Sequence, residues 1–371
     1  VETLISTCNW IIVRLVSSFY TLWYYIEHQE FGGFASLYRI DDHWRDVNVT
    51  KIAYLSLVFL IIPLSGASNP SKYEITVLAT NIANFGGFGE WSFGALYEGA
   101  DETVMFDTGF HEDTVMHNAK RLGKDLSKVE KVILSHFHAD HTGGLLKLRR
   151  EFGQINKRAF SKVYVARGFF DQRLNSKAEI DSANRLGPGG FERVSTFRSE
   201  AEALGITFVV VEGPMEIAEN LFITGPVARQ NEHYNGPSGL FVQIDGSLTP
   251  DIIRDDQSLG MLTEKGWVMM SGCGHAGIIN TGETLRRIKD RPIYAAIGGF
   301  HLWLAEDEVV NRTAEWLGEA GLEKFLGGHC TGIHATNQIS ELLGLERHEI
   351  SHTAVGSVLT RDLNIIRSSV E

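Results

Sequence analysis

The sequence predicts a globular α+β protein, with helices and strands mixed along the chain from about residue 68. Its 371 residues are 43% apolar and 22% charged, which is enough apolar material for a large core. From Tyr73 onward, short β-branched runs alternate with runs of helical period. Neither an internal repeat nor a linker interrupts residues 68–371, so we expect them to form one domain.

The net charge indicates the class of substrate, and the cysteine content indicates whether a disulfide framework is present. The chain has 46 acidic and 34 basic side chains, a formal charge of −12. Because phosphate backbones repel an acidic protein, we expect a small-molecule substrate and no nucleic acid. The cysteines are only Cys8, Cys273 and Cys330, which is no disulfide framework. We expect Cys273 and Cys330 to be reduced.

Residues 1–50 are an N-terminal extension that we leave unassigned. The stretch from Trp10 to Ile26 is apolar and aromatic, but Arg14 interrupts it, so it is a marginal membrane span. The polar residues that follow carry no motif, and the extension contributes nothing to the fold prediction.

Residues 51–67 resemble a signal peptide or membrane anchor. Lys51 precedes an apolar run over 52–64, and Ser65-Gly66-Ala67 supplies small residues for cleavage after Ala67. The alternative is a buried strand or helix of the core. Export predicts an exported or periplasmic protein that contacts the membrane only through this N-terminal segment.

The first half of the domain predicts five strands and two helices. Alternating or β-branched runs mark the strands, and apolar residues at helical period mark the helices. The strands are expected at Tyr73–Thr80, Ser92–Tyr97, Thr103–Phe106, Lys131–Leu134 and Val163–Ala166, and the helices at His111–Leu122 and Leu145–Phe152. The glycine-rich loop over 84–89 lacks the spacing of a dinucleotide-binding turn.

The second half begins with residues 167–200, whose weak periodicity predicts an insertion or lid over the site. We expect a hairpin of Phe208–Val211 with Leu221–Thr224. Further strands are expected at Leu240–Ile244, Trp267–Met270 and Ile293–Ile297, a helix at Thr284–Lys289, and alternating elements in the tail.

One turn carries most of the chemical information. His136, His138, Asp140 and His141 follow the strand ending at Leu134 and precede a helix that opens at residues 142–144. Three imidazoles and a carboxylate on one turn suit Zn, Mn or Fe. The alternative, a solvent-exposed polar turn, is improbable directly after a buried strand. A two-metal site needs further ligands from other strand ends.

Three more histidines occupy such positions. His275, His301 and His329 each follow a predicted strand and adjoin glycines, which let backbones approach closely. One such histidine alone is more often structural, but three with the same arrangement favour a shared site. His233 lies in a polar loop, and we expect it on the surface. The remaining histidines have no comparable context.

Seven short motifs carry a family resemblance. They are Glu90-Trp91, Phe106–Gly109, Ser135–Leu145, Asp255–Gln257, Gly272–Thr281, Gly298–Leu302 and Gly328–Gly332. With them the chain resembles the metallo-β-lactamase superfamily, whose signature is the His-x-His-x-Asp-His turn. More closely, it resembles the branch typified by 7,8-dihydropterin-6-methyl-4-(β-D-ribofuranosyl)aminobenzene 5′-phosphate synthase.

The resemblance implies a four-layer αββα sandwich with a dinuclear site at one edge of its sheets. It implies one or two Zn ions, with Mn or Fe as alternatives. By analogy, one metal is held by His136, His138 and His275, and the other by Asp140, His141 and His329. Asp140 and His301 are the expected catalytic residues, Asp140 orienting the attacking water and His301 facing the substrate. Asp107 is expected to support the ligands.

Two departures from the family pattern bear on these expectations. Many members have a bridging aspartate where this chain has Cys273, so the second metal site is weak or empty, or Cys273 helps to hold a metal. The branch has Gly-Glu-Ile-Pro-Arg where this chain has Gly-Pro-Val-Ala-Arg over 225–229, and that loop therefore lacks a carboxylate.

Three functions are compatible with these features. The first is a metal-dependent hydrolase that attacks a small molecule through a metal-activated water. The second is transfer chemistry like that of the synthase, which export would disfavour. The third is a non-catalytic, metal-containing binding domain, which intact ligands disfavour.

Residues 1–67 are expected to be dispensable for folding. A shortened chain of residues 68–371 should express as a soluble protein with a cooperative thermal transition matching that of the full chain. An insoluble shortened chain beside a well-folded full chain would contradict this prediction.

Overall fold

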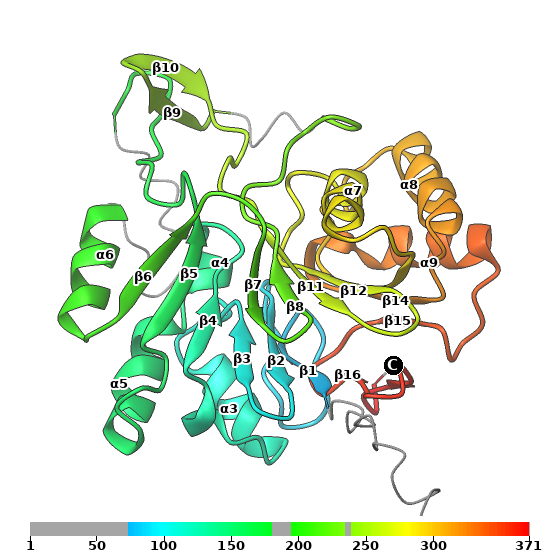
Figure 1. Cartoon of the computed structure of the whole chain (residues 1–371), viewed down its shortest axis with the longest axis horizontal. Helices are drawn as coiled ribbons and strands as arrows, with labels where there is room; N and C mark the ends of the chain where they lie inside the picture. Colours follow the sequence, from blue (N-terminus) through cyan, green and yellow to red (C-terminus); the bar gives the residue numbers. More distant parts are fainter. Residues whose placement is uncertain (1–72, 180–193, 234–238, 371) are drawn as a thin grey trace, which may run out of the picture. The chain divides into compact units, whose positions relative to one another are not determined.

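The computed structural model describes residues 73–179, 194–233 and 239–370, so the predicted segments 1–50 and 51–67 lie outside the described part. Two β-sheets pack face to face, and helices cover the outer face of each sheet (Figure 1). This is the four-layer αββα sandwich that the family resemblance implied. In the described ranges, no helix is both long and apolar enough to cross a membrane.

The first sheet has eight strands, antiparallel from β17 to β3 and parallel from β3 to β6. In spatial order they are β17 (Ile365–Ile366), β16 (Val358–Leu359), β1 (Glu74–Ala79), β2 (Gly94–Glu98), β3 (Thr103–Phe106), β4 (Lys131–Ile133), β5 (Lys162–Ala166) and β6 (Thr207–Val211). The outer face packs against α3 (Thr114–Arg121), α5 (Leu145–Ile155) and α6 (Val194–Ala203).

The second sheet has seven strands, of which β12 to β15 run parallel. Their spatial order is β15 (Ile350–His352), β14 (Lys324–Gly327), β13 (Ile293–Gly298), β12 (Trp267–Ser271), β11 (Ser258–Leu262), β8 (Leu221–Ile223) and β7 (Met215–Ala218). Its outer face packs against α7 (Ile278–Ile288), α8 (Asp307–Glu319) and α9 (Ile333–Leu343).

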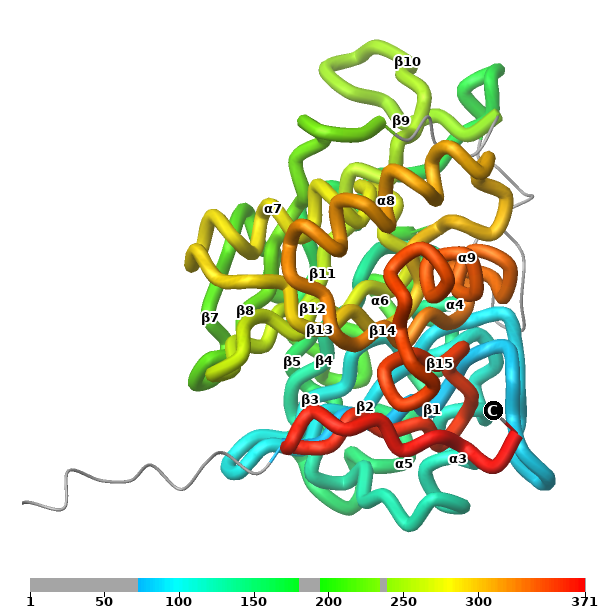
Figure 2. The backbone as a smooth tube through the Cα atoms, turned by 90° about the vertical axis from the view of Figure 1, so that its right-hand side faces the viewer, coloured from blue at the N-terminus to red at the C-terminus, as the bar shows by residue number. Residues whose placement is uncertain are grey.

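Four short elements complete the described chain. They are α4 (Ala139–Thr142), two 3₁₀ helices at Leu126–Lys128 and His329–Thr331, and a separate two-stranded ribbon of β9 (Phe241–Ile244) and β10 (Ser247–Pro250). The ribbon projects from the sandwich in both ribbon views (Figures 1 and 2).

The alternation of side chains along each strand explains how one strand contributes both to the core between the sheets and to the contact with the helices. In β12, Val268 and Met270 enter the core between the sheets, whereas Trp267 and Met269 face the helices. Successive side chains of a strand point to opposite faces, so a strand covered on both faces reads as a continuous apolar run. These interior residues are almost fully buried.

One prediction about the second half was wrong, and another was wrong in part. Residues 208–211 and 221–224 form no hairpin, because β6 pairs with β5 in the first sheet while β8 pairs with β7 and β11 in the second. Part of the proposed lid over 167–200 is instead α6, which buries Phe197 under the first sheet. Residues 180–193 of that lid lie outside the described ranges.

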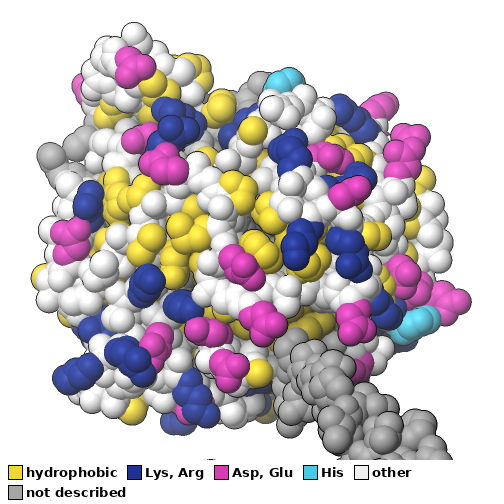
Figure 3. All heavy atoms as spheres, viewed as in Figure 1, with side chains coloured by type: hydrophobic (Ala, Val, Ile, Leu, Met, Phe, Trp, Pro, Cys, Tyr) yellow, Lys and Arg dark blue, Asp and Glu magenta, His cyan; other side chains and the backbone are white. Residues whose placement is uncertain are grey.

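A buried ion-pair network joins the segment after β5 to the loop before β11. The Arg173 guanidinium contacts the carboxylates of Asp251, at 3.0 Å, and Asp255, at 2.5 Å, and all three side chains are at most 2% exposed. The two buried carboxylates therefore share one compensating positive charge. Elsewhere, acidic and basic side chains are intermixed over the surface that Figure 3 shows.

Replacing Arg173 by Met should strongly destabilise the fold, because it leaves Asp251 and Asp255 buried without their cation. Removing one partner of a buried pair costs about 3–5 kcal/mol. The matched control is Arg198→Met, since Arg198 is 50% exposed in its pair with Glu202 and should change stability by less than about 1 kcal/mol. Urea unfolding of both variants tests this, and equal losses would contradict it.

Candidate metal centre

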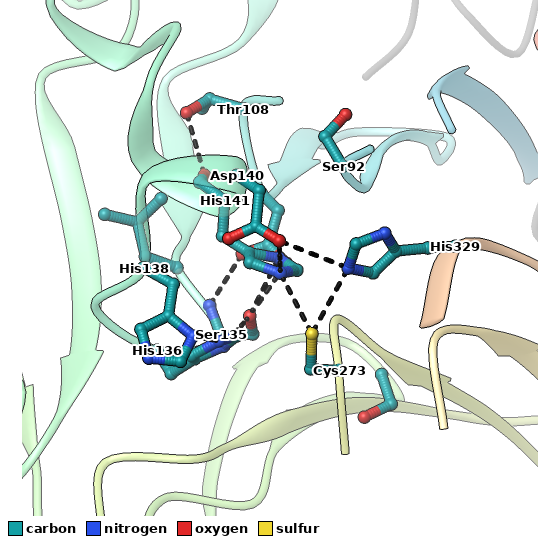
Figure 4. A network of polar contacts seen from close by, with 12 residues as sticks. Ser92, Thr108, Ser135, His136, His138, Asp140, His141, Cys273 and His329 are labelled. Atoms are coloured by element: carbon teal, nitrogen blue, oxygen red, sulfur yellow. Dashed lines mark hydrogen bonds and ion pairs between the residues drawn. The ribbon is translucent and has the colours of Figure 1, made fainter. Parts of the chain in front are cut away.

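The carboxyl ends of five strands converge on one place. Asp107 follows β3, the turn 135–141 follows β4, Cys273 and His275 follow β12, His301 follows β13, and His329 follows β14. In open parallel sheets, this edge is where functional groups gather. Figure 4 shows donors from the two sheets pointing at one another, with Cys273 and His329 facing the 135–141 turn.

The first donor group consists of His136, His138 and His275. Their nearest ring nitrogens lie within 4.8 Å of one another. His136 Nε2 is 2.8 Å from His138 Nδ1, and the His275 ring centroid lies 4.7 Å from that of His136. This is the set predicted for one metal. The structure brings its members together, and ligation itself remains a prediction.

The second donor group consists of Asp140, His141, Cys273 and His329. The Cys273 Sγ atom is 3.2 Å from both His141 Nε2 and His329 Nε2. Asp140 Oδ2 is 3.5 Å from His141 Nε2 and 3.4 Å from His329 Nε2. The structure brings Cys273 together with the three residues predicted for the second metal. Cys273 and Cys330 are both free, buried thiols.

Asp107 connects the two donor groups through hydrogen bonds and close contacts. Its Oδ1 accepts the Ser135 backbone N–H at 2.7 Å, and its Oδ2 lies 2.8 Å from Ser135 Oγ and 2.7 Å from His141 Nδ1. The Ser135 hydroxyl also contacts His136 Nδ1 at 2.9 Å. Asp107 is fully buried with φ 55°, a conformation that costs energy in a residue with a Cβ. It therefore orients one histidine of each group, consistent with its predicted supporting role.

The segment Asp255–Gln257 fixes the loops that carry the donors. Asp255 Oδ2 accepts the Phe137 N–H at 2.7 Å, and Asp256 Oδ2 accepts the Ala276 N–H at 2.7 Å. The Gln257 N–H donates to the Ser135 carbonyl. Burial raises the pKa of Asp256 to about 7, against the opposing Ala276 hydrogen bond. The backbones beside His136, His138 and His275 are thus held by one stretch of chain.

A glycine at 272 is required by the approach of β12 to the 135–141 turn. A Cβ at this position would lie 2.2 Å from Ser135 Oγ and 2.4 Å from Asp107 Oδ2. Any side chain here would displace the contacts through which Asp107 orients the histidines.

The first donor group has the protonation that a transition metal requires, whereas in the second group Asp140 and Asp107, despite burial, raise the pKa of His141 well above its usual value, so a metal would have to displace a proton there. Burial, reinforced by neighbouring histidines, holds the pKa of His136 well below its usual value, and burial lowers that of His138 to about 4. Neutral imidazole is the form that binds metal. Imidazole, carboxylate and sulfur are the donor types of Zn sites. The residues present therefore fit the divalent metal that the fold implies.

A cavity of about 340 Å³ opens beside the first donor group. His301 lines it, and its ring centroid lies 4.5 Å from that of His275. His233 is exposed, as predicted, yet it also lines this cavity, together with Glu232 and Arg312. The sequence pattern offered His233 only as a weaker candidate and did not single out Glu232 or Arg312, because these residues come from a loop and a helix face that only the fold brings together.

Three comparisons place these features among known proteins. The family model described as "Metallo-beta-lactamase superfamily" matches residues 93–213. The 7,8-dihydropterin-6-methyl-4-(β-D-ribofuranosyl)-aminobenzene-5′-phosphate synthase of Methanocaldococcus jannaschii is 30% identical over 247 residues, 66% of this chain and 80% of its own length. An uncharacterized protein of the same organism is 28% identical over 72% of this chain and 94% of its own length.

A solved structure is similar to this chain in both fold and sequence. It is described as a metal-dependent hydrolase of the beta-lactamase superfamily, with 28% identity and a TM-score of 0.61. The similarity covers 77% of this chain and 98% of that one.

Replacing Gly272 by Ala should disrupt the metal centre, because the added Cβ collides with Ser135 and Asp107. Overpacking of this kind costs about 1–3 kcal/mol, and the displaced histidines should also bind less Zn. Gly213→Ala is the matched control, since a Cβ there meets nothing within 4 Å. Urea unfolding and elemental analysis after Zn loading measure both effects. A Gly272→Ala protein that binds Zn like the control would contradict this account.

Proposed function

Because this chain belongs to the metallo-beta-lactamase superfamily, we propose that it is a metal-dependent hydrolase of a small molecule. The observation that carries the proposal is the pairing of two buried donor groups at one sheet edge, beside a cavity large enough for a small ligand. A divalent cation held by these groups would supply Lewis-acid chemistry, activating water and stabilising negative charge on the substrate.

The roles of the protein's own residues follow from their positions. Asp140 is the second-group donor with some exposure, 17%, so its carboxylate both faces the other donors and reaches solvent. We assign it the orientation of the attacking water and acceptance of its proton. His301 projects between the first donor group and the cavity, so we assign it contact with the substrate or proton donation to the leaving group.

The backbone of His301 supports this role. Its φ of 51° is unusual for a residue with a Cβ, and His329 has the same feature with φ 46°. Both residues follow glycine-containing strand ends. Strained backbone of this kind clusters at functional sites, where surrounding contacts maintain it.

The alternative is a transferase like the dihydropterin synthase, and the 30% identity to that relative favours it. The donor groups would then activate a substrate for attack by a second molecule. We also propose that the protein is exported, on the pattern of residues 51–67, and this favours hydrolysis over synthesis of an intracellular cofactor. A non-catalytic binding domain is the third candidate.

Turnover separates the three candidates. Zn-loaded full chain should hydrolyse at least one of a panel of esters, lactones, phosphodiesters and β-lactams, and lose this activity when a chelator removes the metal. Synthesis from paired substrates without hydrolysis would favour the transferase. Tight metal binding with neither reaction would favour the binding domain.

Asp140→Asn and His301→Ala should fail in different ways. Asp140→Asn should lower kcat by about 10²–10⁴-fold and reduce Zn content, since it removes both a proton acceptor and a donor atom. His301→Ala should retain Zn and lose kcat/KM instead. The measurements are steady-state kinetics and elemental analysis, with Asp290→Asn and His348→Ala as exposed controls. Loss of Zn from His301→Ala, or its full activity, would refute the substrate-facing role.

A further inference from the structure

Two half-exposed tryptophans stand beside the second donor group. Trp91 is 47% exposed and Trp303 is 46% exposed. The Trp91 ring centroid lies 5.0 Å from that of His329 and 5.0 Å from that of Trp303. The two indoles meet at an interplanar angle of 68°, so they form the two walls of a corner rather than a closed stack.

The segment that carries Trp91 is fixed by Glu90. The Glu90 carboxylate accepts the backbone N–H groups of Phe110 and His111 and the hydroxyls of Ser92 and Thr114, at 2.7–3.0 Å. The Glu90 N–H in turn donates to the Thr80 carbonyl. The Trp91 backbone is therefore held between two anchored neighbours, and its exposure does not come from a loosely attached loop.

Trp303 is fixed to the turn that bears His329. The backbone N–H of Trp303 donates to the Cys330 carbonyl at 3.1 Å. Its Cα and Cβ pack so closely on Gly332 that a Cβ at that glycine would lie 3.0 Å from both. The site thus keeps two rigidly mounted indoles partly in water, although such rings gain most from burial.

Shielding of His329 is the simpler explanation, but it accounts for only part of the arrangement. A shield needs the Trp91 ring against the imidazole, and it does not need a second indole at a steep angle with nearly half of its surface exposed. Indole faces left open in this way, held on fixed backbones, offer a preorganised stacking surface, which lowers the entropic cost of binding a planar ring.

We propose that Trp91 and Trp303 form a subsite that stacks a planar aromatic or heteroaromatic ring of the substrate. The inference rests on the proposed function, because it places the reacting group of that substrate at Asp140 and His329. The His301 cavity lies against the other donor group, so the ring and the rest of the substrate would contact different donor groups.

The test compares two carboxylates with the same carbon skeleton, 2-naphthoate and its saturated analogue decahydro-2-naphthoate. Isothermal titration calorimetry on Zn-loaded full chain should show the aromatic ligand binding about 3–10-fold more tightly. Trp91→Leu and Trp303→Leu should each reduce that preference, because leucine keeps apolar contact without a π face. Trp91→Phe and Trp303→Phe should retain it, and Trp316→Phe, on α8, is the tryptophan control.

Metal content distinguishes stacking from shielding, so each variant is also assayed for Zn. The proposal expects full Zn in the Leu variants together with loss of the aromatic preference. Equal affinity of wild type for the two ligands, no binding of either at millimolar concentration, or unchanged preference in both Leu variants would overturn it. Loss of Zn from Trp91→Leu with an intact preference in Trp303→Leu would assign the tryptophans to shielding and also overturn it.

These outcomes do not depend on turnover. An aromatic preference that disappears in the Leu variants, in a protein that hydrolyses nothing, supports the subsite while removing the proposed hydrolase function. Hydrolysis without any aromatic preference supports the function and overturns the subsite.

Discussion

The buried carboxylate of Asp107 is the contact on which the candidate site depends. It binds the Ser135 backbone and lies against the Ser135 hydroxyl and His141 Nδ1, and Ser135 in turn contacts His136. One carboxylate thus orients a member of each donor group. Gly272 lets the second sheet approach this carboxylate, which brings Cys273 and His275 to the donors of the first sheet. The strained backbone at Asp107 is maintained by these contacts.

Local sequence patterns placed most of the strands and the candidate ligands, but they did not predict β7, β10 or β11. His136 to His141 follow a short buried strand, and His275 and His329 follow others, so strand ends alone indicated a common edge. The assignment of β6 and β8 to different sheets was not predictable in this way, because non-local contacts determine which sheet a strand joins. The Arg173 network was missed for the same reason, since its partners lie about 80 positions away in the chain.

Different parts of the site have different proposed roles. In the proposed function the donor groups set where charge is stabilised, and the same set would serve either hydrolysis or transfer. In the two proposals, the His301 cavity and the Trp91–Trp303 corner hold the substrate beside different donor groups.

Metal stoichiometry tests the central claim most directly. Elemental analysis of the Zn-loaded full chain should give two ions per chain, with about one remaining in His136→Ala and about one in His329→Ala, since each substitution removes a donor from one group. Both single variants should remain folded by circular dichroism. Metal content that is unchanged in both variants would contradict the assignment of these two groups as the metal centre.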